Sequence, residues 1–326
     1  MMLRACFPAV LCGAMGLAVA LAGCDSGGSA DEGGQPAQQP PPAPAYFDEP
    51  AWHPAGRYIA AEHADSVDTD NDGRKDEMFG GVWLVDALSG QTQPLLRGYG
   101  APAWSPDGRR LAAHRGGQVF TIEVRSLNPA RADTTTLRQL TAEGANFFPA
   151  WSPDGEWIAY DSNVQNPAAP YEIWKMRSGG AGRRNISGFS SRMPSWSPDG
   201  AQIVHIRYAT SGGDVAVVDS AGGSLRSLTN DAVNNDRDAP KYAPRGNRIA
   251  FVVQRDGPAA LWIMALDGAE QRQVSPSGAW RFDWSPDGQR LVFLFRRQER
   301  PPGSGELWFV NADGTGLRQL THFNTP

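Results

Sequence analysis

From residue 46 to residue 326, short apolar runs alternate with turn residues in an order that recurs six times. Each unit holds an apolar run that ends in an aromatic residue, a tight turn, a second apolar run, a variable loop, a third run and a short last run. No part of this region shows a sustained helical period, so the pattern predicts short β-strands. The six second runs are RYIAAEH, RRLAAHR, EWIAYDS, AQIVHIR, NRIAFVV and QRLVFLF.

The turn that follows the first run of each unit has a nearly constant sequence. Trp-Ser-Pro-Asp-Gly suits a tight hairpin because Pro presets φ, Asp hydrogen-bonds to the local backbone and Gly adopts a left-handed conformation. Successive copies lie 52, 47, 45, 46 and 42 residues apart, a period that is typical of propellers and other repeat architectures. The four clear copies and the two degenerate ones occupy residues 104–108, 151–155, 196–200, 284–288, 52–56 and 242–246.

Each unit therefore contains four short antiparallel strands, which is the content of one propeller blade. The predicted fold class is all-β: a six-bladed β-propeller of four-stranded antiparallel blades over residues 46–326. Nine of the eleven tryptophans occupy two positions of the repeat, before the first turn and in the third strand. This regular placement indicates packing between sheets, and Trp280 is one of the two tryptophans outside it.

The pattern PAWSPDG, followed at intervals by IAY, EIW, GG and RNIS, resembles the repeat of the TolB-type β-propellers, which is related to the WD-type repeat. Blade five departs from the pattern, because Tyr242 and Arg245 stand where the clear copies have Trp and Asp. The resemblance implies the propeller fold but no single function, since propellers host unrelated activities. TolB itself carries an α/β domain before its propeller, and we expect none here.

The first 23 residues have the pattern of a secretory signal peptide, with a positive charge at Arg4 and then an apolar run to Ala22. A membrane-spanning helix is the alternative, because the run is about long enough to span a bilayer. The sequence LAGC at 21–24 resembles the lipobox of bacterial lipoproteins, which favours the signal peptide and implies that Cys24 is lipidated. In enteric lipoproteins an aspartate in the position of Asp25 implies retention at the inner membrane, with the outer membrane as the alternative.

Residues 24–45 comprise Cys24 and a segment without aromatic or branched apolar side chains. Such a composition cannot bury enough surface to fold, so it predicts a flexible Gly/Ser/Pro-rich tether between the membrane and the propeller. The net charge is −5 and no basic stripe occurs, which argues against a nucleic-acid partner. We expect a lipid-anchored monomer that faces the periplasm of a bacterial cell envelope.

The sequence offers little that could carry catalysis. A nucleophile elbow needs Gly-x-Ser-x-Gly, which does not occur, and the five histidines have no metal-ligand spacing. His205 stands where sister blades have an aromatic residue, which favours a core histidine over a ligand. We therefore predict a protein-binding or scaffolding function without enzymatic activity. The alternative is a lyase or hydrolase that acts on polymers of the cell envelope or on imported polymers.

Blade one contains an acidic insertion between its second and third strands, DSVDTDNDGRKDEMFGG. Its pattern D-x-D-x-D-G-x-x-D places oxygen ligands at alternating positions, and the glycine permits the sharp bend of a Ca²⁺ loop. The opening resembles that of an EF-hand loop, but Phe79 replaces the bidentate glutamate at the twelfth position. A structural Ca²⁺ site and a solvated acidic loop are both open. The candidate ligands are Asp68, Asp70, Asp72 and Asp76.

The first strand of a propeller blade lines the central channel, so the residues that lead into the six first strands lie around one mouth of it. Large aromatic residues beside arginines have the composition of interface hot spots. We hypothesise that a protein or peptide segment docks there, with the aromatics as apolar anchors and the arginines paired with its acidic groups. The alternative is that Phe147 and Phe148 plug the channel. The candidate partner-binding residues are Phe147, Phe148, Arg192, Met193, Trp280 and Arg281.

Overall fold

The computed structural model describes most of the chain from residue 46 onward. The predictions of a signal peptide, a tether and lipidation at Cys24 lie outside the described residues, and so do the candidate Ca²⁺ ligands. Among the described elements there is no helix that could span a lipid bilayer. The described residues are 46–67, 77–168, 170–188, 190–209, 212–230, 236–254, 257–295 and 305–322.

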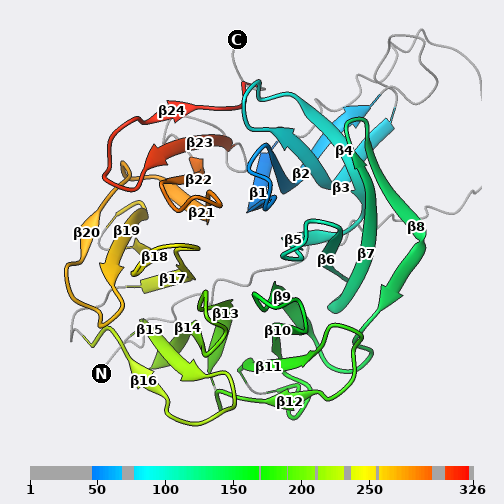
Figure 1. Cartoon of the computed structure of the whole chain (residues 1–326). Coiled ribbons are helices and arrows are strands. Elements are labelled where there is room, and N and C mark those ends of the chain that lie inside the picture. The colour runs from blue at the N-terminus through cyan, green and yellow to red at the C-terminus, as the bar shows by residue number, and fades with distance from the viewer. Residues whose placement is uncertain are drawn as a thin grey trace, which may run out of the picture. The chain divides into compact units, whose positions relative to one another are not determined.

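Twenty-four strands form six four-stranded sheets in this part of the chain, and each sheet consists of four strands that follow one another in sequence. Figure 1 shows the sheets arranged as blades around a central axis, with the first strand of each blade innermost and the fourth outermost. Neighbouring strands within a blade pair antiparallel. The prediction of an all-β, six-bladed propeller is confirmed.

The strands of blades one to three are β1 (Tyr46–Trp52), β2 (Tyr58–Val67), β3 (Glu77–Asp86), β4 (Thr92–Arg97), β5 (Gly100–Trp104), β6 (Arg110–Arg115), β7 (Gln118–Leu127), β8 (Ala130–Gln139), β9 (Asn146–Trp151), β10 (Trp157–Ser162), β11 (Glu172–Arg177) and β12 (Arg184–Asn185). The strands of blades four to six are β13 (Ser191–Trp196), β14 (Gln202–Ala209), β15 (Gly212–Asp219), β16 (Arg226–Ser227), β17 (Asp236–Tyr242), β18 (Arg248–Gln254), β19 (Ala260–Ala265), β20 (Arg272–Gln273), β21 (Ala279–Trp284), β22 (Arg290–Phe295), β23 (Glu306–Asn311) and β24 (Arg318–Gln319).

The hairpin turns have the predicted hydrogen bonds. In blade two, Asp107 Oδ1 accepts a hydrogen bond from the Ser105 hydroxyl at 2.5 Å and one from the Arg109 N–H at 3.0 Å. Gly108 has φ +69°, the left-handed conformation that this turn requires. The bond from the serine hydroxyl holds the pKa of Asp107 below its ordinary value, because it stabilises the charged carboxylate. The same arrangement recurs at Asp154, Asp199 and Asp287.

Two strand regions are longer than the sequence pattern indicated. The hairpin β2–β3 extends to the pair Val67 and Glu77, so both ends of the acidic insertion of blade one are strand rather than loop. The outermost strand of blade two, β8, has ten residues and pairs from Ala130 onward with an equally long β7. Leu127 and Ala130 pack there against the apolar cluster between blades one and two, which gives the extension its support.

The ring closes between blades six and one without exchange of a strand. Phe47 and Trp52 of blade one form one buried apolar cluster with Leu294 and Phe309 of blade six. In addition, the backbone N–H of Trp52 donates a hydrogen bond to the Asp283 carboxylate at 2.6 Å. We call the junction of blades six and one the seam. Because each sheet holds only consecutive strands, the seam is held by side-chain packing and by such single hydrogen bonds.

The tryptophans that precede the turns are buried between blades, as predicted. At the junction of blades six and one, the Trp52 indole N–H donates to the Gly56 carbonyl of its own turn at 2.9 Å. The Trp104 indole has no hydrogen-bond partner among the described residues. In blades three, four and six the indole N–H donates to the innermost strand of the preceding blade, and this bond helps to set the register between neighbouring blades. The three such bonds run from Trp151 to the Ala103 carbonyl at 3.2 Å, from Trp196 to that of Ala150 at 3.0 Å and from Trp284 to that of Lys241 at 3.2 Å.

Candidate functional site

Every innermost strand carries a β-bulge at a residue with positive φ. The pairing register with the second strand shifts there, so two residues of the innermost strand oppose one residue of its neighbour. A non-glycine residue in this conformation costs roughly 1–2 kcal/mol, so its recurrence in six blades indicates a constraint imposed by the fold. We call these residues the bulge ring: Glu49 (φ +43°), Ala101 (φ +45°), Phe148 (φ +49°), Met193 (φ +58°), Ala239 (φ +46°) and Arg281 (φ +28°).

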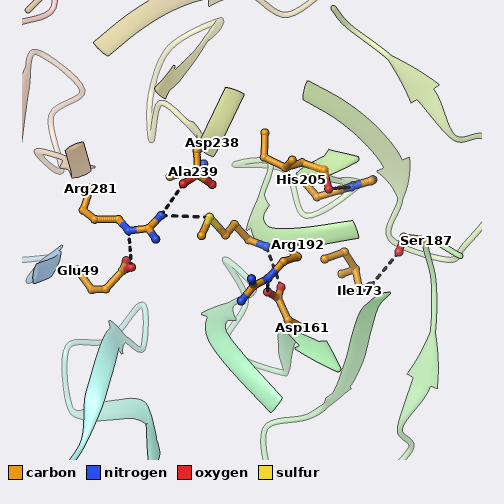
Figure 2. A network of polar contacts seen from close by, with 11 residues as sticks. Glu49, Asp161, Ile173, Ser187, Arg192, His205, Asp238, Ala239 and Arg281 are labelled. Carbon is orange, nitrogen blue, oxygen red and sulfur yellow. Dashed lines mark hydrogen bonds and ion pairs between the residues drawn. The ribbon is translucent and has the colours of Figure 1, made fainter. Parts of the chain in front are cut away.

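Arg281 reaches from blade six across the channel to other members of the bulge ring. Its Nε lies 2.8 Å from Glu49 Oε1, and its Nη1 donates to Asp238 Oδ2 at 2.9 Å (Figure 2). Nη1 also donates to Met193 Sδ at 3.4 Å, and the guanidinium carbon lies 5.7 Å from the centre of the Phe148 ring. Side chains from five blades therefore meet at the level of the bulge ring and narrow the channel there.

Arg192 is held by a second set of contacts beside the first. Its Nε lies 3.1 Å from Asp161 Oδ2, and the other oxygen of this carboxyl accepts the Met193 N–H at 2.7 Å (Figure 2). The guanidinium carbon of Arg192 lies 4.7 Å from the centre of the Tyr171 ring and 5.4 Å from that of Phe148. This guanidinium is therefore fixed between a buried carboxyl group and two aromatic rings.

Both arginines that the sequence suggested for acidic groups of a partner are thus paired with carboxyl groups of this chain. Arg281 also lies 4.0 Å from Asp48, so three carboxyl groups converge on one guanidinium. In the described part of the channel, carboxyl groups outnumber these two arginines. The five are Asp48, Glu49, Glu62, Asp161 and Asp238.

Burial dominates the ionisation of these carboxyl groups. It raises the pKa of Glu49 to about 7, although Arg281 acts in the opposite direction. It likewise raises the pKa of Asp161 to about 7 against the effect of Arg192. For Glu62, burial and the nearby charge of Asp48 together raise the pKa to about 7. These groups change their charge near neutral pH.

Gly100 makes room for Glu62. A Cβ atom at position 100 would lie 2.3 Å from Glu62 Oε2 and 3.4 Å from His114 Nε2. Burial lowers the pKa of His114 to about 4, so this ring is neutral near pH 7, and Phe147 packs against it edge-to-face with 5.0 Å between ring centres. Sequence reasoning missed Gly100, Glu62, His114 and Asp161. A signal existed for the two acids, because each stands near the end of an otherwise apolar second run.

The six candidate partner-binding residues lie on β9, β13 and β21, at the end of the channel where the innermost strands begin. We call this end the start mouth, and the end at the Trp-Ser-Pro-Asp-Gly turns the turn mouth. Phe147, Phe148 and Trp280 are partly buried, whereas Met193 is buried. Trp280 packs against the apolar clusters on both sides of blade six.

A cavity of ≈ 230 Å³ occupies the channel between the bulge ring and the turn mouth. Prolines that follow the bulge residues line it, together with tryptophans that precede the turns. Its two sides differ at the position two residues after the bulge, because blades one to three have alanine there and blades four to six have polar side chains. These residues are Ala51, Ala103, Ala150, Ser195, Lys241 and Asp283.

In the part of the chain that the structure describes, no three His, Cys, Asp or Glu side chains are placed to hold a metal ion. His205 is fully buried, and its Nδ1 lies 3.2 Å from the Ile206 carbonyl oxygen (Figure 2). Burial lowers the pKa of His205 to about 4, which agrees with the predicted core position. The predicted Ca²⁺ loop lies outside the described residues and stays a prediction.

Three comparisons place the chain among known proteins. An uncharacterised protein of Agrobacterium fabrum is 29% identical over 198 residues, which are 60% of this chain and 64% of that protein, so the chain spans less than two thirds of that relative. TolB from Acinetobacter baumannii has a TM-score of 0.60 at 20% identity, over 83% of this chain and 61% of that one. The β-propeller domain of the trilobed protease from Pyrococcus furiosus, described as having an open velcro topology, has a TM-score of 0.57 at 13% identity, over 86% of this chain and 97% of that one.

At these identities the solved structures show the fold alone. The sequence match to a family model goes further, because the TolB β-propeller domain matches residues 95–238 and 194–325. Together these two matches cover most of the propeller, from blade one to blade six. The chain therefore belongs to the TolB β-propeller domain family.

Proposed function

We propose that this protein is a lipid-anchored, monomeric propeller of the bacterial cell envelope that binds a protein or peptide segment at its start mouth. The observation that carries the proposal is the contrast between the mouths. In these antiparallel blades the loops between second and third strands lie at the start mouth, and they differ in length from residues 116–117 in blade two to 163–171 in blade three. The turn mouth instead holds the repeated turns. Binding residues concentrate on variable loops carried by a rigid scaffold.

The chemistry of the start mouth suggests what the partner presents. Phe147 and Trp280 are partly exposed and supply apolar anchors. Arg192 and Arg281 are engaged by internal carboxyl groups, and five carboxyl groups surround these two guanidinium groups, so the excess charge around them is negative. The partner segment should therefore carry basic side chains beside an apolar one, rather than the acidic groups expected from the two arginines.

The membrane anchor and the Ca²⁺ loop belong to the same proposal. The lipobox-like LAGC supports lipidation of Cys24, with Asp25 favouring the inner membrane, and the tether of residues 24–45 would hold the propeller off the membrane in the periplasm. Any Ca²⁺ bound by Asp68, Asp70, Asp72 and Asp76 would be structural. These aspartates lie in the sequence between Val67 and Glu77, the ends of the β2–β3 hairpin.

The alternative proposal is a lyase or hydrolase that acts on polymers of the envelope or on imported polymers. One observation favours it, because a carboxyl group with a pKa of about 7, such as that of Glu62, suits general acid–base chemistry. The enzyme hypothesis predicts that Glu62→Gln abolishes the release of fragments from such polymers. The binding hypothesis predicts no release from the unmodified protein.

Photocrosslinking in living cells tests the binding proposal. A benzophenone side chain replaces Phe147 at the start mouth of the full-length protein, and in a matched control it replaces Leu88, which is 77% exposed in the turn between β3 and β4 at the turn mouth. We expect a discrete crosslinked partner from position 147 that position 88 does not give. The same products from both positions, or none from position 147, would contradict the proposal.

A further inference from the structure

The cavity on the turn-mouth side of the bulge ring has the dimensions of a small-molecule site. Its lining residues run from five members of the bulge ring to the turns, and none precedes a bulge residue. Its volume of ≈ 230 Å³ exceeds that of a cavity of about 150 Å³ that holds benzene, yet it is below the range of about 300–1,000 Å³ typical of sites for drug-sized ligands. It therefore suits one small molecule or one end group.

On the polar side of this cavity, Lys241 has hydrogen-bond donors that Asp283 does not use. The Asp283 carboxylate accepts two bonds, from Lys241 Nζ at 3.1 Å and from the Trp52 N–H at 2.6 Å across the seam. An ammonium group has three donors, and Lys241 makes one hydrogen bond, the one to Asp283, among the described residues. The Lys241 side chain is 30% exposed and lines the cavity. The Lys241 ammonium group can therefore donate further hydrogen bonds to a ligand in the cavity.

The opposite side of the cavity is mostly apolar. Its one ionisable lining residue is Glu49 of the bulge ring, and burial raises the pKa of this carboxyl group to about 7, so that it is largely neutral below that pH. Ala51, Ala103 and Ala150 replace polar side chains there, and the prolines of the same strands add further apolar surface. A ligand that matches both sides has an anionic group at one end and a short aliphatic group at the other. Charge-assisted hydrogen bonds to Lys241 would fix its orientation.

We infer that the cavity binds a small aliphatic carboxylic acid, with its carboxylate at Lys241 and its tail against the alanine and proline wall of blades one to three. The partner proposed for the start mouth is not needed for this site. Arg281 and its contacts lie between the two regions, so a ligand would enter from the turn mouth.

Two probes of the same shape test the inference on the full-length protein. They are 4-methylpentanoate and its uncharged amide, titrated by calorimetry and by the fluorescence of the tryptophans that line the cavity. We expect saturable binding of the carboxylate in the millimolar range or tighter, and binding of the amide that is weaker by about tenfold or more, because a bond to a charged group is lost. No saturable binding of the carboxylate, or equal affinity for the two probes, overturns the inference.

Three variants locate the site. Lys241→Met should remove the preference for the carboxylate, and Ala103→Leu should abolish binding of both probes by filling the cavity without touching the ion pair. The matched control is Lys175→Met, because Lys175 is a buried lysine outside the cavity that lies 4.3 Å from the centre of the Trp157 ring. Lys175→Met should keep the preference. Retention of the preference by Lys241→Met places the ligand elsewhere and contradicts the inference.

Discussion

The start mouth and the turn mouth are formed by the same six innermost strands, yet their acidic groups behave in opposite ways. At the start mouth, burial raises the pKa of Glu49 and Asp161 to about 7. At the turn mouth, the hydrogen bond from Ser105 holds the pKa of Asp107 below its ordinary value. The turn aspartates are exposed and accept two hydrogen bonds each through Oδ1, whereas the channel carboxyl groups have lost water. The repeated turn thus stabilises one end of each blade, whereas the residues and loops at the other end differ from blade to blade.

The largest effect should come from Arg281, which holds the start mouth together. Arg281→Ala leaves the partly buried carboxyl groups of Glu49 and Asp238 without their cation, and we expect the free energy of unfolding to fall by about 3 kcal/mol. Glu156→Ala is the control, because its pair with Arg177 is exposed on both sides and is worth at most about 1 kcal/mol. Urea unfolding measures both. Equal losses would mean that the start-mouth network is no stronger than a surface ion pair.

The opposite pKa shifts predict opposite responses to pH. The folded-state pKa of Asp161, about 7, exceeds its ordinary value of 3.8, so the folded state binds more protons between these values. The stability that Asp161 contributes is therefore complete below pH 3.8 and is lost as the pH rises through 7. Relative to wild type, Asp161→Asn should gain stability between pH 5 and pH 8, by at most about 1.4 kcal/mol per pH unit.

Asp107 gives the matched case at the turn mouth. Its folded-state pKa lies below 3.8, so its contribution is present above pH 3.8 and is lost as the pH falls through the folded-state pKa. Asp107→Asn should therefore leave the change in stability between pH 5 and pH 8 as in wild type and reduce the loss below pH 4. Urea unfolding at these pH values separates the two groups. The same pH dependence in both variants would remove the difference between the mouths.

The smallest of these effects concerns Ca²⁺. If Asp68, Asp70, Asp72 and Asp76 bind the ion, Ca²⁺ at about five times its Kd should stabilise the fold by about 1 kcal/mol, because only the native state binds it. Differential scanning fluorimetry should show a rise of a few degrees in Tm with Ca²⁺. The change of Asp68, Asp70 and Asp72 to alanine should abolish the rise. An unchanged Tm of the wild type in Ca²⁺ would identify a solvated acidic loop.

The repeat made the fold predictable because each of its recurring residues has a local physical reason for its position in the unit. The Pro-Asp-Gly turns, the apolar second runs and the buried tryptophans follow from backbone preference and burial, and they recur where the sequence places them. The β-bulge in each innermost strand has a weaker signature, which did not enter the prediction: a proline, which cannot donate to a strand ladder, follows the bulge residue in blades one to five. Glu49, Met193 and Arg281 share a conformation that no residue type demands, and only the structure shows it.

The location of the candidate binding residues was predictable, whereas the charges and contacts around them were not. Phe147, Arg192 and Trp280 could be placed at one mouth because the repeat fixes where each innermost strand begins. Pairing of Arg192 with Asp161 joins residues 31 positions apart, in neighbouring blades. The contact of Arg281 with Glu49 joins the last blade to the first. Such contacts depend on how neighbouring blades pack and on closure of the ring, which a sequence pattern does not encode.

The central claim, that a partner binds at the start mouth and not at the turn mouth, is tested most directly by recovery of that partner with matched double variants. Full-length protein is purified from solubilised membranes as wild type, as Phe147→Ala with Trp280→Ala, and as Leu88→Ala with Leu266→Ala, which removes two exposed leucines at the turn mouth. Mass spectrometry then measures the amount of the partner, as identified by photocrosslinking at position 147, relative to the amount of purified protein. We predict that the start-mouth variant loses the partner by about tenfold or more, as for hot-spot residues, and that the turn-mouth variant keeps it. Retention of the partner by the start-mouth variant, or equal loss in both variants, would contradict the account.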